Sequence, residues 1–303
     1  MNRKYIYLLA ALMTLGAFSC DAQTPLLQHI RELSSDKYQG RKTGTQGSRM
    51  AADYIVRQFK ALGLKSFNGS YKHPFSFKAG KTTVTGANLI AFLPGKKQKA
   101  IVISAHYDHL GVKNGKIYNG ADDDASGVGG ILEIAAYFAK HKPEHTLIFV
   151  AFDAEEMGLQ GAKAFVSRSP VPLSRIRLNI NLDMVSHNDK GELYVSGTRH
   201  YPKLEQYLAV KIRGIKLMTG HDDREQEKDD WTFQGDHGAF HEEGIPFLYF
   251  GVEDHKDYHQ PTDDFENINA TFYVKAVNAI LNVVQNYDTG TTIKEIFKSK
   301  KVM

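Results

Sequence analysis

Residues 100–108 read AIVISAHYD, an apolar, β-branched run that ends abruptly in histidine, tyrosine and aspartate. Apolar runs at 147–150 and 176–182 are likewise followed by residues that bear carboxylates. In an open α/β sheet, ligands bind beyond the carboxyl ends of the strands. The recurrence therefore predicts an α/β fold in which polar side chains from several strand ends meet at one functional site.

Strand and helix patterns alternate from residue 100 onward. We predict strands within 71–93 and at 100–105, 146–152, 176–182 and 246–250, and helices at 47–64, 125–140, 158–168 and 270–287. Such alternation indicates a mixed, largely parallel central sheet with helices on both faces. No repeat or long low-complexity linker interrupts the pattern, so we expect one catalytic domain over residues 23–303.

The first 22 residues differ from the rest of the chain. Positive charge at Arg3 and Lys4 precedes an apolar run at 6–18, which is shorter than the roughly 18–20 residues that span a bilayer. This pattern predicts a secretory signal peptide at 1–22 and an exported mature protein without a transmembrane span. Cys20 is the only cysteine, so no intrachain disulfide can form. Two outcomes remain open: a lipid anchor at Cys20, or simple cleavage that yields a periplasmic or secreted protein.

Composition and charge exclude one class of partner. The chain has 303 residues, is 42% hydrophobic, and contains 26 glycines and 9 prolines, which is typical of a globular domain with a sizeable core. The 38 lysines and arginines nearly balance the 34 aspartates and glutamates, and no segment concentrates basic and aromatic residues. Nucleic acid is therefore not an expected partner.

Short polar segments carry side chains that bind metals. They are His106 with Asp108, the triplet 122–124, Glu155 with Glu156, Asp183, and Tyr258 with His259. Carboxylates buried together would repel one another without a cation. Zinc takes imidazole nitrogen and carboxylate oxygen, and two zinc ions about 3.5–4 Å apart need a bridging ligand, for which the triplet is the candidate. The sequence therefore predicts a metalloenzyme.

Each segment also has a simpler interpretation when taken alone. Asp124 or Ser126 can cap the helix at 125–140 without any metal. Glu155 and Glu156 can form an exposed, acidic helix start, or one can bind metal while its neighbour acts as a general base. The segments taken together, rather than any one of them alone, favour a metal site.

The sequence around these residues resembles metallopeptidase family 28, which includes bacterial secreted leucyl aminopeptidases, glutamate carboxypeptidase II and the glutaminyl cyclases. The similar motifs are HYD at 106–108, NGADDDASG at 119–127, FDAEEMG at 152–158, NLDM at 181–184 and HQPTD at 259–263, with further likeness at 41–47 and 236–246. The resemblance extends over residues 30–287. This sequence departs from the family pattern at Gly235, where many relatives have serine. It also lacks a disulfide near the mouth of the substrate site.

The resemblance implies a zinc exopeptidase-like fold and two zinc ions per chain. One zinc would be held by His106 and Asp183, and the other by Glu156 and His259. Asp123 would bridge the two ions. A cis peptide bond would follow Asp123, as is normal in the family.

The resemblance also assigns roles beside the metal. Glu155 would be the general base, and Asp108 would hydrogen-bond the nitrogen of His106 that faces away from zinc. Candidates for the substrate pocket are Met184, His237, Phe250 and Tyr258. Other histidines near the motifs are expected to be structural or solvated: His109, His187, His241 and His255.

The function expected is that of a secreted di-zinc aminopeptidase, which removes N-terminal residues from peptides by a metal-activated water with Glu155 as base. A glutaminyl cyclase-like enzyme or a carboxypeptidase on the same fold is the alternative, and a non-enzymatic receptor-like or scaffold relative is a remote one. The absence of a Gly-x-Ser-x-Gly segment from the chain disfavours a serine hydrolase.

Overall fold

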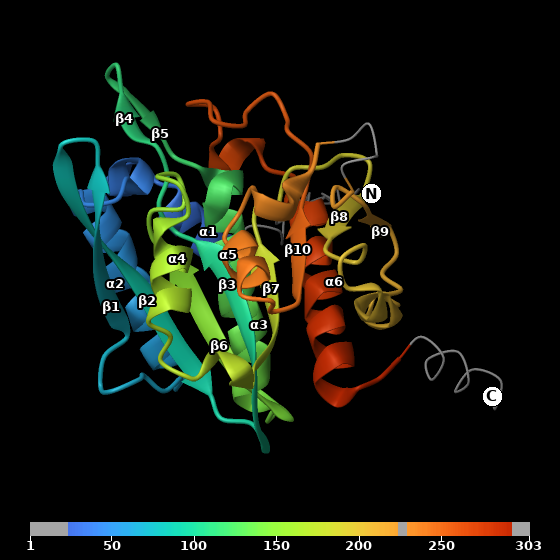
Figure 1. Cartoon of the computed structure of the whole chain (residues 1–303). Coiled ribbons are helices and arrows are strands. Elements are labelled where there is room, and N and C mark those ends of the chain that lie inside the picture. The colour runs from blue at the N-terminus through green and yellow to red at the C-terminus, as the bar shows by residue number, and fades with distance from the viewer. Residues whose placement is uncertain (1–23, 224–228, 293–303) are drawn as a thin grey trace, which may run out of the picture.

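The computed structural model describes residues 24–223 and 229–292. The predicted signal peptide at 1–22 and Cys20 lie outside the described residues. The described residues form an α/β fold in which helices pack around one large mixed sheet (Figure 1). This is the fold class that the alternating pattern predicted.

The sheet has eight strands in the order β1-β2-β6-β3-β7-β10-β8-β9. Their bounds are β1 Lys72–Ala79, β2 Thr82–Leu93, β3 Lys97–His106, β6 His145–Phe152, β7 Ile176–Leu182, β8 Glu192–Ser196, β9 Lys216–Thr219 and β10 Phe247–Gly251. The four central strands β6, β3, β7 and β10 run parallel to one another. β1, β2 and β6 pair in antiparallel fashion on one side, and β8 pairs antiparallel with β10 on the other. The carboxyl ends of the central strands therefore meet at one edge of the sheet.

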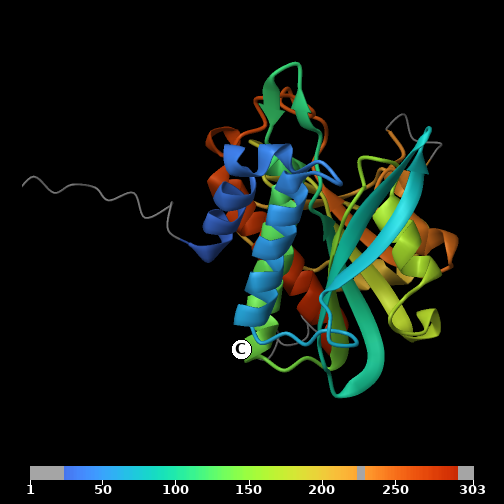
Figure 2. The same cartoon turned by 90° about the vertical axis from the view of Figure 1, so that its left-hand side faces the viewer.

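Helices cover both faces of the sheet (Figure 2). They are α1 Pro25–Leu33, α2 Gln46–Ala61, α3 Gly127–Lys140, α4 Gln160–Ser167, α5 His237–Glu242 and α6 Ala270–Thr289. Helices α1, α2, α3 and α6 pack on one face, and α4 and α5 pack on the other. The alternation within β3 follows from this arrangement: Ile101 and Ile103 face the first layer, whereas Val102 faces the second.

Local sequence signals set several helix ends. The Thr45 side chain accepts a hydrogen bond from the backbone N–H of Ser48 at the start of α2. The Asn269 side chain accepts one from Phe272 N–H at the start of α6, and Gly290, with φ of 77°, ends that helix in the left-handed conformation. The predicted helices at 47–64, 125–140, 158–168 and 270–287 correspond to α2, α3, α4 and α6.

Several short elements were not predicted from the sequence. They are α1, α5, β8, β9, the hairpin β4 Gly111–Lys113 with β5 Lys116–Tyr118, a one-turn segment Ala121–Ser126, and 3₁₀ turns at Asp36–Arg41, Leu173–Arg175, Pro202–Tyr207, Trp231–Phe233 and Phe265–Asn267. None of the helices in the described part of the chain combines the length and the apolar character that crossing a membrane requires.

Candidate metal centre

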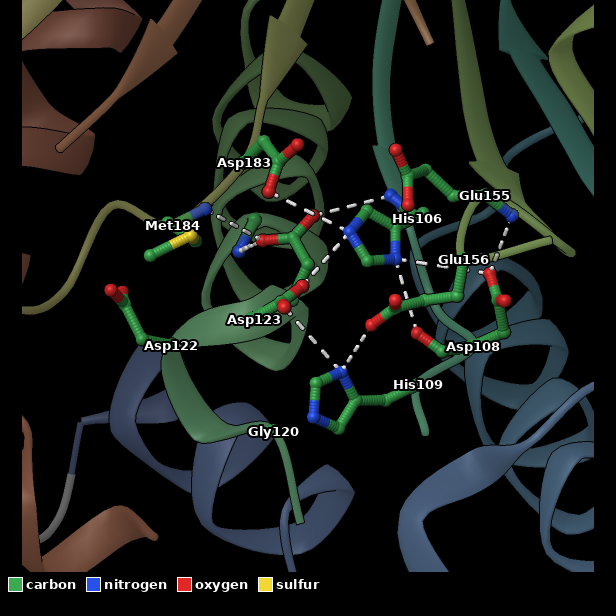
Figure 3. A network of polar contacts seen from close by, with 12 residues as sticks. His106, Asp108, His109, Gly120, Asp122, Asp123, Glu155, Glu156, Asp183 and Met184 are labelled. Atoms are coloured by element: carbon green, nitrogen blue, oxygen red, sulfur yellow. Dashed lines mark hydrogen bonds and ion pairs between the residues drawn. The ribbon is translucent and has the colours of Figure 1, made fainter. Parts of the chain in front are cut away.

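The predicted ligands converge at the edge where the central parallel strands end. His106 is the last residue of β3, Glu156 lies just after β6, and Asp183 follows β7 directly. Asp123 lies in the turn before α3, and His259 lies in the loop after β10. Figure 3 shows that most of these side chains, which come from distant parts of the sequence, point toward one another. All of them except His259 are at most about one-tenth exposed.

The side chains form two groups of donors. In the first group, His106 Nε2 lies 3.1 Å from Asp123 Oδ1 and 3.6 Å from Asp183 Oδ1. In the second group, His259 Nε2 lies 3.1 Å from Asp123 Oδ2 and 3.4 Å from Glu156 Oε2. Asp123 is common to both groups and turns one carboxylate oxygen toward each. This is the geometry of a ligand that can bridge two ions.

A further histidine, His109, lies in the second group. Its Nδ1 is 2.7 Å from Glu156 Oε1 and 3.5 Å from Asp123 Oδ2 (Figure 3). From the sequence we expect His109 to be structural or solvated, because a lone histidine near a motif is more often so than a ligand. The loop that faces His109 contains Gly120, whose φ is 58°. A Cβ on Gly120 would lie 2.6 Å from the His109 ring, so the close approach of this loop requires glycine.

The donor groups fit zinc. Each combines imidazole nitrogen with carboxylate oxygen, which is the ligand set that zinc prefers. The buried Nε2 of His109 has no hydrogen-bond partner among the described residues, and Glu156 Oε1 and His109 Nδ1 contact each other at 2.7 Å without hydrogen-bond geometry. Orphaned buried polar atoms are rare unless an ion or water satisfies them. Burial and Asp123 raise the pKa of Glu156, but contacts with His109 and His259 outweigh them and lower it to about 2, so this ligand is ionised.

The orientation of His106 differs from what the resemblance implied. Its Nδ1 lies 3.0 Å from the backbone carbonyl oxygen of Asp108, and the nearer carboxylate oxygen of Asp108 is 3.8 Å away. The Asp108 carboxylate instead accepts hydrogen bonds from Glu155 N–H at 3.0 Å and from the Thr43 hydroxyl at 3.2 Å. Asp108 thus holds His106 through its main chain and the Glu155 loop through its side chain.

Asp124 connects three segments of the centre. Its Oδ1 accepts hydrogen bonds from Gly127 N–H at 2.8 Å, at the start of α3, and from Met184 N–H at 3.2 Å. Its Oδ2 accepts one from His106 N–H at 3.2 Å. The helix-capping alternative for Asp124 is therefore observed together with the metal-ligand geometry of Asp123. The peptide bond between these two aspartates is cis, as the resemblance implied.

A buried arginine supports the turn that carries Asp123. Arg41 is fully buried, and its guanidinium donates hydrogen bonds to the carbonyl oxygens of Leu33, Tyr107, Asn119 and Gly120. It also lies 3.5 Å from the carbonyl oxygen of Asp123. Arg41 therefore fixes the loop geometry and brings a positive charge close to the buried carboxylates.

Glu155 stands beside the donor groups without belonging to either of them. It lines the cavity of the centre, and it is not among the residues whose donor atoms converge. Burial raises the pKa of Glu155 well above its usual value; His106 opposes this shift, and the carboxylates of Asp183 and Asp236 add to it. A buried carboxyl group with a raised pKa beside a metal site has the properties of a proton-transfer group.

The backbone around the centre adopts an uncommon conformation. Ala154, Met184 and His259 have φ values of 60°, 56° and 54°, in the left-handed region that residues other than glycine rarely occupy. Such residues tend to gather at functional sites, where the surrounding structure holds them in place. Here Ala154 precedes Glu155, Met184 follows Asp183, and His259 is itself one of the donors.

The cavity above the centre has a volume of about 80 Å³. Its non-ligand lining consists of Met184, Trp231, Gln234, Tyr249, Val252, Asp254 and Tyr258, together with Glu155. Met184 and Tyr258 were pocket candidates from the sequence. The other two candidates do not line this cavity: Phe250 is fully buried in the core, and His237 is fully buried with its Nε2 2.9 Å from the carbonyl oxygen of Trp231. Trp231, Tyr249 and Asp254 were missed.

A mixed α/β sheet with two histidine–carboxylate donor groups at its strand ends defines a site of the kind that binds zinc. A sequence profile of peptidase family M28 matches residues 88–284, and the chain belongs to this family. Aminopeptidase YwaD of Bacillus subtilis (strain 168) is 30% identical over 241 residues, which is 72% of this chain and 49% of that protein. The chain covers between 49% and 61% of the length of three curated relatives that it matches.

Solved structures share the fold. A Zn-dependent exopeptidase from Parabacteroides distasonis superposes with a TM-score of 0.69 at 20% identity, over 86% of this chain and 97% of that one. Porphyromonas gingivalis glutaminyl cyclase gives a TM-score of 0.71 at 18% identity, over 87% of this chain and 97% of that one. The zinc exopeptidase-like fold implied by the sequence resemblance is confirmed. With its donor groups, the chain is a member of a peptidase family with a zinc-type metal centre.

Proposed function

We propose that this chain is an exported di-zinc aminopeptidase. The observation that carries the proposal is the Asp123 carboxylate, with one oxygen toward each of two histidine–carboxylate groups. A single-metal site has no need for such a shared ligand. In this assignment His106 and Asp183 hold one zinc ion, and Glu156 and His259 hold the other.

Zinc, when bound, supplies Lewis-acid polarisation of a carbonyl group and acidification of a coordinated water. The chain's own part is positioning and proton transfer. Glu155 is the general base: it accepts a proton from the attacking water and returns it to the departing amine. Asp108 is a positioning residue for this step, because its carboxylate accepts a hydrogen bond from the backbone N–H of Glu155 at 3.0 Å.

The cavity suggests which end of a peptide is taken. Asp254, Glu155 and the acidic ligands give it a negative lining, which attracts the ammonium group of an N-terminus and repels a C-terminal carboxylate. Trp231, Tyr249 and Tyr258 supply aromatic surface for one side chain. The small volume of about 80 Å³ favours an end residue over the interior of a longer segment.

The proposal is tested with aminoacyl and N-acetylated aminoacyl reporters of the same sequence, combined with zinc analysis. We expect hydrolysis of the free-amine reporters only, with two catalytic zinc ions required for full activity. Equal hydrolysis of the blocked reporters, or release of C-terminal residues from peptides, would contradict the assignment.

A glutaminyl cyclase-like activity is the second candidate, because the fold of the Porphyromonas gingivalis enzyme is as similar as that of the zinc exopeptidase. The presence of a complete second donor group favours hydrolysis instead. Peptides that begin with glutamine separate the two: a peptidase releases free glutamine, and a cyclase yields a pyroglutamyl peptide and ammonia.

Export and lipidation at Cys20 are tested in the producing cell. Labelling with a lipid precursor should distinguish a wild-type anchor from a Cys20→Ala variant that is exported without one. Recovery of residues 1–20 on soluble cytoplasmic protein would exclude export.

A further inference from the structure

Two successive backbone amides lead into the proposed general base, and each donates to a buried carboxylate. Ala154 N–H donates to Asp153 Oδ1 at 3.0 Å. Glu155 N–H donates to Asp108 Oδ1 at 3.0 Å (Figure 3). Asp108 is fully buried, and Asp153 is almost as completely buried. Asp153 belongs to neither donor group and does not line the cavity above the centre, so the role of its carboxylate lies elsewhere.

A single threonine joins these two carboxylates. The hydroxyl of Thr43, a buried residue just before α2, lies 2.8 Å from Asp153 Oδ1 and 3.2 Å from Asp108 Oδ2. A threonine hydroxyl has one hydrogen to donate, so the two carboxylates share it in a three-centre bond. Thr43 is 65 residues from Asp108 and 110 residues from Asp153 along the chain. It therefore ties a distant segment to the loop that carries Glu155.

The Asp153 carboxylate is held from its other side as well. Its Oδ2 accepts hydrogen bonds from the backbone N–H of Ala87 in β2 and from the Tyr107 hydroxyl, both at 2.9 Å. Together with Thr43 and Ala154, donors from four segments converge on this one carboxylate. Hydrogen bonds to an ionised carboxylate are stronger than those between neutral groups, so Asp153 is firmly fixed.

The backbone conformation at Ala154 explains why the loop needs such support. Its φ of 60° lies in the left-handed region, which is unfavourable for alanine. This turn precedes the two glutamates, of which Glu156 contacts His259 and Glu155 stands outside the donor groups. If the amides of Ala154 and Glu155 lost their acceptors, the turn would relax toward commoner backbone angles and carry the Glu155 carboxyl out of place.

We propose that Thr43 is a positioning residue for Glu155 and that it acts through Asp108 and Asp153. The inference rests on the proposed function, in which Glu155 is the general base. Thr43 is not a proposed metal ligand and does not line the cavity above the centre. Its hydroxyl keeps the two carboxylates at the separation at which they accept successive amides. It thereby fixes the direction in which the Glu155 side chain enters the cavity.

The kinetics of Thr43→Val test this role, because valine keeps nearly the shape of threonine and removes the hydroxyl. We expect kcat on an aminoacyl reporter to fall roughly 10–100-fold, the scale on which a displacement of about 1 Å acts. KM and zinc content should stay close to their wild-type values, since the affected group acts in the transition state and binds no metal. Thr43→Ser retains the hydroxyl and should recover most of the lost rate.

Repeating the substitution in the Glu155→Gln background separates positioning from a general loss of structure. If Thr43 acts through Glu155, Thr43→Val should lower kcat by less than about 2-fold there, because the group that it positions is already absent. The same fall in kcat in both backgrounds would indicate a merely structural role and overturn the proposal. Wild-type kcat in Thr43→Val with Glu155 intact would overturn it as well.

A second pair of variants covers the case in which Thr43→Val does not fold. Asp153→Asn should lower kcat, and Asp288→Asn is its matched control. Asp288 is 2% exposed, and its carboxylate also accepts two successive amides, Glu144 N–H at 2.9 Å and His145 N–H at 2.7 Å, at the start of β6 rather than beyond its end. Asp288→Asn should therefore leave kcat near the wild-type value, with thermal unfolding as the measure of folding in both variants. An equal fall in kcat in the two variants would overturn the proposal.

Failure of this inference can be told apart from failure of the proposed function. Near wild-type turnover in Glu155→Gln would refute the general base and, with it, the positioning role. Wild-type kcat in Thr43→Val beside an inactive Glu155→Gln would refute the positioning role alone.

Discussion

Glu155 and Glu156 are adjacent carboxylates with different expected roles, and substitution by glutamine separates them. Glutamine has nearly the same shape as glutamate, so neither variant creates a cavity. Glu155 belongs to neither donor group, whereas Glu156 Oε2 lies 3.4 Å from His259 Nε2. Glu155→Gln should therefore remove proton transfer while zinc binding persists, and Glu156→Gln should weaken zinc binding itself.

The size of the first effect follows from the proton-transfer role. A positioned general base contributes about 10²–10⁴-fold to the rate, which corresponds to about 3–5 kcal/mol of activation free energy. Burial and nearby carboxylates raise the pKa of Glu155, so the zinc-free protein disfavours the charged form of this side chain, and a neutral glutamine avoids that cost. We therefore expect Glu155→Gln to be no less stable than the wild type when zinc is absent.

The assay combines kcat on an aminoacyl reporter with zinc content measured on the same preparation. Glu155→Gln should lose activity at unchanged zinc content, and Glu156→Gln should lose zinc at limiting concentrations and regain activity in excess zinc. Near wild-type turnover in Glu155→Gln would refute the role of general base. Loss of zinc from Glu155→Gln together with full retention in Glu156→Gln would reverse the assignment.

Other predictions concern residues around the centre. His109→Ala should lower zinc affinity roughly 10–100-fold, as loss of a residue that holds a ligand commonly does, with equilibrium dialysis as the measurement. Arg41→Met should lower the free energy of unfolding by about 3–5 kcal/mol in urea titrations, because buried carbonyl groups lose their donor. Burial lowers the pKa of His237 to about 3, so its contribution to stability is present above pH 6.5 and is lost as the pH falls toward 3. By pH 5 this histidine alone should account for about 2 kcal/mol, measured as the difference in pH dependence between the wild type and His237→Gln.

The predicted central sheet is confirmed, and the structure brings the residues proposed as metal ligands together at its edge. Parallel strands end at a common edge, so polar residues after β3, β6 and β7 had to lie near one another. β8 and β9 were missed because they are only 5 and 4 residues long. Strands this short carry little periodicity, and their pairing with β10 and with each other decides their conformation.

The finer contacts at the site depend on information that spacing does not hold. The position of Asp108 two residues after His106 does not indicate whether its carbonyl oxygen or its carboxylate contacts the His106 ring. In the structure the carbonyl oxygen makes this contact. Phe250 was a pocket candidate, yet Tyr249 lines the cavity and Phe250 enters the core. Adjacent residues of a strand face opposite sides, so an uncertainty of one position exchanges the two roles.

The order in which the donors occur along the chain has a consequence for folding. His106 and His259 are roughly 150 residues apart, and the proposed metal cluster that they share would close the intervening chain as a covalent cross-link does. With Cys20 as the only cysteine, the protein has no disulfide with which to restrict its unfolded state. Chain-entropy arguments give a loop of this length on the order of 5 kcal/mol when it is closed. Zinc supply in the compartment where the protein folds would then set how much of the chain reaches the native state, and chelation would act on folding yield as well as on turnover.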